Sequence, residues 1–88
     1  ALPGGYGTLE EILEIITLKQ LKYHHKPIVI LNARGFYDSL LEQFENIIKW
    51  KFAKTECRQL YHVTDDVSDA LEYIDNYEPF TFKDKWLT

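Results

Sequence analysis

The sequence predicts an α/β fold in which a parallel β-sheet is flanked by helices. Two observations predict it: a glycine-rich turn leads directly into a helical segment, and short β-branched runs alternate with helical segments along the 88 residues. A helix–strand–helix–strand–helix order requires parallel strands joined by right-handed crossovers, which is a Rossmann-like arrangement. Turns of this glycine-rich type follow a buried strand, of which only Ala1 and Leu2 would be present. We therefore expect the chain to be the C-terminal part of a larger domain.

The composition is that of a single globular domain, with 45% apolar and 27% charged residues and a net charge of −4. This charge argues against binding to nucleic acid or to an anionic membrane surface, and no apolar run approaches the roughly 20 residues that span a bilayer. Cys57 is the single cysteine, which excludes an internal disulfide and favours a reducing, cytoplasmic setting. We expect residues 1–77 to form the C-terminal half of one nucleotide-binding domain and 78–88 to form a tail.

The first helix is expected from Thr8 to about Tyr23, where apolar residues recur at helical spacing. Pro27 ends this region, because the residue before a proline avoids the helical conformation. The β-branched run at 28–31 is typical of a strand buried on both faces of a parallel sheet. Residues 32–37 then form the loop at its carboxyl end.

The second half of the chain is again expected to form a helix followed by a strand. Asp38 or Ser39 can cap the next helix, and Ser39 and Glu42 have the spacing of a capping box. Apolar residues at helical spacing carry this helix to Phe52. A second short strand is expected at 60–63.

The last helix is expected to begin at a cap formed by Asp65 or Asp66 and to continue through Ile74. After Pro79 the aromatic-rich end of the chain has no helical pattern. It is expected either to be disordered or to pack its aromatic side chains on a neighbour.

The candidate phosphate site is the turn that contains Gly4, Gly5 and Gly7 with Thr8 behind it. Glycines allow positive φ and let backbone N–H groups approach an anion closely. The start of the helix adds unpaired N–H donors and the positive end of the helix dipole. The alternative is a strand-to-helix turn that Thr8 caps and that binds nothing.

Glu11 follows the turn by about one helical turn and has two interpretations. It can complete a capping box with Thr8, or it can face the sugar of a phosphorylated ligand and support an oxocarbenium-like transition state. The spacing leaves both open. Glu10 is expected to be a solvated neighbour that favours the helix N-terminus. Thr17 can be satisfied within the core or can touch a ligand that reaches along the helix.

Other polar residues are weaker candidates. His24, His25 and Lys26 favour a loop over a metal site or a pyridoxal phosphate lysine, because adjacent histidines point in different directions and a polar turn does not desolvate an amine. Asn32 and Arg34 lie at the carboxyl end of a strand, where open α/β sheets bind ligands. A loop or subunit-contact role suits these two residues equally well.

The run from Pro3 to Glu11 has the form PGGxGTxxE and resembles the signature of the LOG family, the cytokinin riboside 5′-monophosphate phosphoribohydrolases, often labelled lysine decarboxylase-like. The resemblance continues through residues 16–21, 25–27, 31–32 and 35–41. It extends to about Ile74 and leaves out the tail.

This resemblance implies a usually dimeric enzyme of cytokinin biosynthesis that hydrolyses the N-glycosidic bond of a nucleoside 5′-monophosphate, with a cytokinin-type or purine base. The products are the free base and ribose 5-phosphate, and no cofactor or metal is expected. Glu11 is then catalytic. The expected phosphate and ribose contacts are Gly4, Gly5, Tyr6, Gly7, Thr8, Glu10 and Thr17.

Members of the family carry an Arg–Lys pair and a second glycine-rich segment upstream of this motif, and neither is in this chain. The resemblance therefore implies half of an active site, completed by a missing N-terminal half, and an isolated chain without activity. The alternative is a non-catalytic nucleotide-binding protein of the same fold, such as a molybdenum cofactor carrier.

Overall fold

Two short parallel strands lie at the centre of the structure. The computed structural model describes residues 1–79. β1 (Val29–Leu31) pairs with β2 (His62–Thr64), with Ile30 opposite Val63. The other elements are the α-helices α1 (Tyr6–Gln20), α2 (Asp38–Lys49) and α3 (Val67–Asp75) and the 3-10 helices η1 (Ala33–Gly35) and η2 (Thr55–Leu60). The predicted α/β class with parallel strands is confirmed.

Ala1 extends the sheet beyond β1, on the edge away from β2. Its nitrogen donates to the carbonyl oxygen of Val29 at 2.6 Å, and its carbonyl oxygen accepts from the N–H of Leu31 at 2.9 Å. Residues of adjacent parallel strands pair in this way. The glycine turn therefore leaves the sheet at the carboxyl end of its strands, as does the segment that follows β1.

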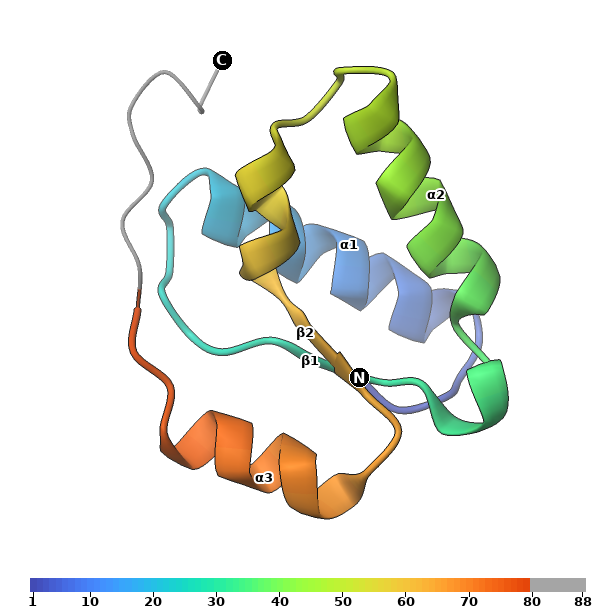
Figure 1. The fold of residues 1–88 in the computed structure, drawn as a ribbon, viewed down its shortest axis with the longest axis vertical. Coiled ribbons are helices and arrows are strands. Elements are labelled where there is room, and N and C mark those ends of the chain that lie inside the picture. The colour runs from blue at the N-terminus through green and yellow to red at the C-terminus, as the bar shows by residue number, and fades with distance from the viewer. Residues whose placement is uncertain (80–88) are drawn as a thin grey trace.

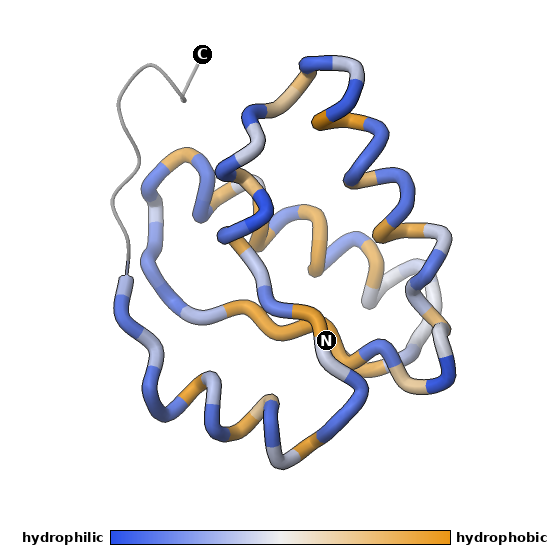
Figure 2. The backbone as a smooth tube through the Cα atoms, in the orientation of Figure 1, coloured by the Kyte–Doolittle hydropathy of each residue, from blue (hydrophilic) through white to orange (hydrophobic). Residues whose placement is uncertain are grey.

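The helices form layers on both faces of the sheet (Figure 1). α1 and α2 lie side by side on one face, and α3 covers the other face and contacts both strands. Ile30 is fully buried and packs with Ile12 of α1 and with Tyr37. Figure 2 shows β1 as an apolar centre, while apolar and polar residues alternate in β2 and along the helices.

The start and end of α1 differ from the prediction. The helix begins at Tyr6 with Gly5 as its N-cap, and no side chain caps it. Thr8 therefore lies within the first turn, and of the two interpretations left open for Glu11, the capping box with Thr8 is wrong. Glycine is an acceptable N-cap because its backbone adopts the extended conformation required there. The helix ends at Gln20 rather than at Tyr23, because Lys22 has a left-handed φ of 68°.

The start of α2 is fixed by Asn32 rather than by a capping box. Tyr37 is the N-cap residue and makes no side-chain cap, so the expected roles of Asp38, Ser39 and Glu42 as caps are wrong. The Asn32 Oδ1 atom accepts from the backbone N–H of Tyr37 at 2.6 Å, and its Nδ2 donates to Asp38 Oδ1 at 2.7 Å. An amide side chain five residues upstream thus replaces the local cap.

The segment between α2 and β2 was predicted less well. α2 ends at Lys49, and Phe52 is 84% exposed rather than part of the helix. η2 was not predicted, and it takes Leu60 out of the expected strand. Cys57 and Leu60 are both buried, and their spacing of three residues matches one turn of a 3-10 helix.

The cap of α3 is confirmed as Asp66, whose Oδ1 accepts from the backbone N–H of Ser68 at 2.9 Å. Val67 and Leu71 of this helix stay largely exposed. The expected boundary of the tail at residue 78 is not tested, and most of that tail, 80–88, lies outside the described residues.

Polar and aromatic contacts attach α3 to the sheet. His62 Nε2 lies 2.8 Å from Asp69 Oδ2, and the His62 ring stacks on Tyr73 with centroids 4.2 Å apart. The hydrogen bond from His62 holds the pKa of Asp69 below its ordinary value of 3.8. The contact between His62 and Asp69 therefore stabilises the docking of α3 more when Asp69 is ionised.

Asp69→Asn should remove a stabilisation that exists only while Asp69 is ionised. Because the folded pKa of Asp69 is lowered, this stabilisation is present above pH 3.8 and is lost as the pH falls through the folded pKa. We expect the urea midpoint of the wild type to exceed that of the variant near pH 6 and the two to converge in acid. Asp75→Asn on the same helix is the control, and a midpoint difference that does not change with pH would contradict the prediction.

Candidate active site

The glycines of the turn are not explained by positive φ. Gly5 has φ −102° and ψ −155°, and among the described glycines only Gly35 lies in the left-handed region. The expected conformational reason for this turn is therefore wrong. Gly4 is instead required by close packing, since a Cβ there would lie 2.9 Å from the Cβ of Thr8 and still closer to its hydroxyl.

Gly5 and Gly7 border open space. A Cβ at either position would meet no atom within 4 Å. The first backbone bond of α1 runs from the N–H of Leu9 to the carbonyl of Gly5 at 3.1 Å. The N–H groups of residues 6–8 precede this bond and have no partner within the described chain. Neutral donors at the positive end of a helix, with no side chain over them, are suited to bind an anion.

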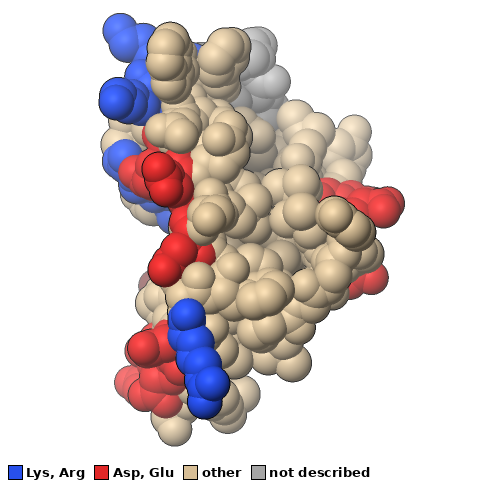
Figure 3. Space-filling model, turned by 90° about the vertical axis from the view of Figure 1, so that its right-hand side faces the viewer, with Lys and Arg blue, Asp and Glu red and all other residues tan. Residues whose placement is uncertain are grey.

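A depression of about 490 Å³ lies beside the turn, between the N-termini of α1 and α2. Its lining residues are Gly4, Gly5, Tyr6, Leu9, Phe36, Tyr37, Ser39 and Leu40. The Tyr37 hydroxyl donates to the Leu2 carbonyl at 2.6 Å and so ties the start of the turn to the segment after β1. On this side of the molecule, Figure 3 shows a broad uncharged area, with acidic and basic side chains along its left margin and acidic side chains at its right margin.

Glu11 is exposed and makes no hydrogen bond or ion pair within the described chain. It follows Thr8 by three residues, so the two side chains are neighbours on the helix surface. Since Thr8 is not a cap, no structural role accounts for the carboxylate of Glu11. Glu10 is also exposed, and its side chain lies about 100° from that of Glu11 around the helix axis.

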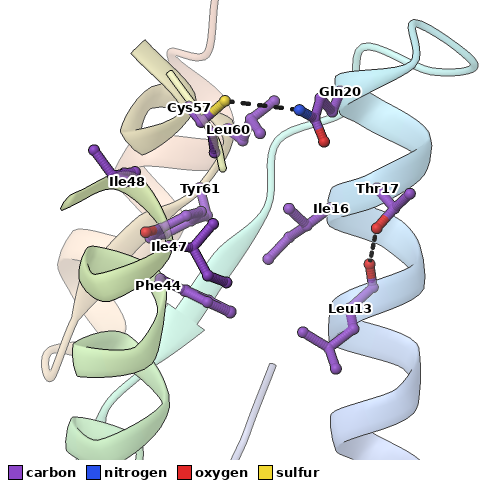
Figure 4. Close-up of a pocket in the computed structure, with 11 residues that line it drawn as sticks. Leu13, Ile16, Thr17, Gln20, Phe44, Ile47, Ile48, Cys57, Leu60 and Tyr61 are labelled. Atoms are coloured by element: carbon purple, nitrogen blue, oxygen red, sulfur yellow. Dashed lines mark hydrogen bonds between the residues drawn. The ribbon is translucent and has the colours of Figure 1, made fainter. Parts of the chain in front are cut away.

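Thr17 lies apart from the glycine turn. It is nine residues beyond Thr8, or about 14 Å along the helix axis. Its hydroxyl donates to the Leu13 carbonyl at 2.8 Å. It lines a different, mostly apolar groove of about 170 Å³ between α1, α2 and η2, shown in Figure 4. The described chain alone does not bring Thr17 together with the turn.

The thiol of Cys57 borders the same groove. Burial raises the pKa of Cys57, and Gln20 Nε2 lies 3.9 Å from its sulfur. The neighbouring Arg58 does not activate it, because its guanidinium forms a bidentate pair with Glu45. This thiol is therefore a poor nucleophile.

The histidine pair lies in a loop, as predicted. His24 Nε2 lies 2.9 Å from the Ile15 carbonyl oxygen, and its Nδ1 accepts from the backbone N–H of Lys26 at 3.1 Å. Both ring nitrogens are thus engaged by the backbone. In the part of the chain that the structure describes, no three His, Cys, Asp or Glu side chains gather closely enough to hold a metal ion. No described helix is long and apolar enough to cross a membrane.

Lys19 was missed by the sequence analysis. It is 3% exposed, its Nζ donates to the Leu60 carbonyl at 3.0 Å, and it lies 4.6 Å from the centroid of the Tyr77 ring. Burial lowers the pKa of Lys19. The sequence signal for its burial was its spacing from Ile12 and Ile16, which places Lys19 on the buried stripe of α1. It joins the end of that helix to η2 and to the end of α3.

Comparison with known proteins yields one family and several relatives. The sequence model of a family described as possible lysine decarboxylase matches residues 1–74. A probable cytokinin riboside 5′-monophosphate phosphoribohydrolase of Oryza sativa subsp. japonica is 46% identical over 79 residues, which cover 90% of this chain and 32% of the relative. A cytokinin riboside 5′-monophosphate phosphoribohydrolase of Arabidopsis thaliana is 42% identical over 79 residues, with 90% and 37% covered. The chain spans about a third of the length of these curated relatives.

Tyr37→Phe should release the glycine turn without emptying the core. The ring stays in place, while the hydrogen bond to the Leu2 carbonyl is lost, at a cost of about 0.5–1.5 kcal/mol in the free energy of unfolding. Hydrogen exchange of the Leu9 and Leu31 amides, which donate to the carbonyls of Gly5 and Ala1, should accelerate more than that of α3. Tyr23→Phe, on a ring that is 76% exposed, is the control. Equal stability and exchange in both variants would show that Tyr37 does not hold the turn.

Proposed function

Since this chain belongs to the LOG family, we propose that the protein carrying it hydrolyses the N-glycosidic bond of a nucleoside 5′-monophosphate, with a cytokinin-type or purine base. Water adds to C1′ of the ribose, and the base leaves with the bonding electrons and takes up a proton, so the products are free base and ribose 5-phosphate. The names of the relatives support this activity. Because the chain spans about a third of their length, the proposal concerns the whole protein, and we propose that the isolated chain is inactive.

The observation that carries the proposal is the bare start of α1. Gly5 has an ordinary negative φ, and Gly7 lies within the helix. Both have open space where a side chain would lie. Gly5 is the N-cap, where glycine is favoured over alanine. At Gly7, inside the helix, glycine lowers stability relative to alanine, and no contact in the described chain requires it there. We propose that the N–H groups of residues 6–8 bind the 5′-phosphate there, with Gly4 and Thr8 shaping the turn.

Glu11 is proposed as the catalytic carboxylate. Breaking the bond between the base and the ribose develops positive charge on the sugar ring, and an ionised carboxylate stabilises that charge. Glu11 is exposed, unpaired in the described chain and one turn beyond the proposed phosphate site. Tyr6 and Glu10 are proposed to contact the same nucleotide. Thr17 is proposed to contact a more distant part of the ligand, since it lies well along α1.

A decarboxylase activity, as the description of the family model would imply, is not proposed. A Schiff-base lysine needs both a lowered pKa and access for its carbonyl partner. Lys26 is exposed in a polar loop. Lys19 has a lowered pKa but is 3% exposed and bonded to the Leu60 carbonyl. Neither lysine meets both requirements.

We also propose that the protein is a dimer and that it is cytoplasmic. Leu13 and Ile15 of α1 are 42% and 43% exposed. Apolar side chains that gather on an exposed surface mark an interaction site. Their cover would come from the remainder of the protein or from a second copy.

The experiment that tests the proposal is release of free base by the full-length protein. Nucleoside 5′-monophosphates should be hydrolysed, while the matched nucleosides should not. Tight binding of the monophosphate with no turnover would overturn the enzyme and favour a non-catalytic nucleotide or cofactor carrier.

Glu11→Gln in the full-length protein should lower kcat by orders of magnitude, because the amide cannot carry the negative charge. The free energy of unfolding should change by less than about 0.5 kcal/mol, since the side chain is exposed and unpaired in the described chain. Glu14→Gln, also exposed on α1, is the control and should keep the wild-type rate. Wild-type turnover by the Glu11 variant would remove its catalytic role.

Gly7→Ala should separate stability from ligand binding. The added methyl group meets no atom within 4 Å and favours the helix, so the variant should be more stable by about 0.5–1 kcal/mol. The same methyl group lies beside the open N–H groups and should weaken binding of ribose 5-phosphate at least tenfold. Calorimetric titration measures the affinity. A stabilised variant with unchanged affinity would place the phosphate elsewhere.

A further inference from the structure

Arg34 has an unfavourable backbone conformation. Three non-glycine residues have positive φ among the described residues: Lys22 at 68°, Arg34 at 53° and Lys51 at 66°. Lys22 and Lys51 follow α1 and α2, at the position where a left-handed residue commonly ends a helix. Arg34 lies instead within η1, in the segment that leaves the carboxyl end of β1. A long side chain is disfavoured there relative to glycine or asparagine.

The charges at this edge of the sheet are unbalanced. The segments that leave the carboxyl ends of the sheet are residues 2–11, 32–39 and 65–69. Together they carry the carboxylates of Glu10, Glu11, Asp38, Asp65, Asp66 and Asp69, and Arg34 is their only lysine or arginine. A phosphate monoester carries up to two negative charges and would be repelled by these groups. The edge offers it helix N–H groups and one cationic side chain.

Arg34 follows the strand next to the glycine turn, although it is not among the residues that line the depression beside that turn. Ala1 pairs with β1, so the chain at the turn and the chain at η1 leave neighbouring positions that are about 4.8 Å apart in a sheet. Phe36, two residues beyond Arg34, lines the same depression as Gly4 and Gly5. Arg34 is exposed and makes no hydrogen bond or ion pair within the described chain.

We propose that Arg34 binds the phosphate group of the nucleotide held at the glycine turn. The inference rests on the proposed function and adds to it a cation from this chain. A guanidinium donates two parallel hydrogen bonds to phosphate oxygens, which gives both charge and orientation. The left-handed turn at Arg34 is held by backbone bonds from Gly35 to Asn32 and from Phe36 to Ala33, and it leaves the guanidinium exposed at this end of the sheet.

The test compares Arg34→Asn with Lys51→Asn in the full-length protein. Asparagine tolerates the left-handed conformation better than either basic residue, so both variants should show a higher midpoint of urea unfolding. Each also removes one positive charge. Only Arg34→Asn should weaken AMP binding, by about tenfold or more, since a hydrogen bond between charged groups is lost. Arg34→Lys should have an intermediate affinity, because the charge remains without the bidentate geometry.

Three results would overturn the inference in distinguishable ways. If the wild type binds AMP and Arg34→Asn binds it equally well, Arg34 is a solvated loop residue and the proposed function stands. If the wild type shows no affinity for AMP or ribose 5-phosphate, the phosphate site itself fails, and the role of Arg34 fails with it. A change of oligomeric state in Arg34→Asn, measured by light scattering, with unchanged affinity would assign the side chain to a subunit contact.

Discussion

The candidate site depends on the two hydrogen bonds that hold Ala1 against β1. They place the glycine turn beside the segment that follows β1, and the Tyr37 hydroxyl then fixes the distance between these two segments through the Leu2 carbonyl. Because parallel strands end at the same end of the sheet, the start of α1 and the start of α2 meet there. Ile30 is fully buried and packs with Ile12 and Tyr37, one residue from each of the two segments that meet.

Polar groups at this edge divide into two kinds. Asn32 and Asp66 have structural roles, since each accepts a hydrogen bond from one backbone N–H group at a helix start. The first N–H groups of α1 and the carboxylate of Glu11 are not satisfied within the described chain. Among the described helices, α3 thus has a side-chain cap, while the first N–H groups of α1 and α2 have none.

Sequence reasoning predicted the fold better than the details of the site. Helical spacing and the β-branched run at 28–31 identified the order of α1, β1, α2, β2 and α3, because burial on a sheet imposes these patterns. The capping box at Thr8 failed because a glycine one residue before the helix can serve as N-cap. The role of Asn32 and the burial of Lys19 depend on contacts five and 41 residues away, which local patterns do not contain.

The charge balance explains why one segment of the protein would be insufficient for the proposed reaction. Glu11 must be ionised to stabilise a cationic sugar, and the phosphate on the same substrate is itself an anion. Backbone N–H groups at a helix start supply only about half a positive charge. Arg34 adds one more, yet the edge still holds an excess of carboxylates. A further cation from outside residues 1–79 would let Glu11 and the phosphate remain charged side by side, as the resemblance to enzymes with an upstream Arg–Lys pair implies.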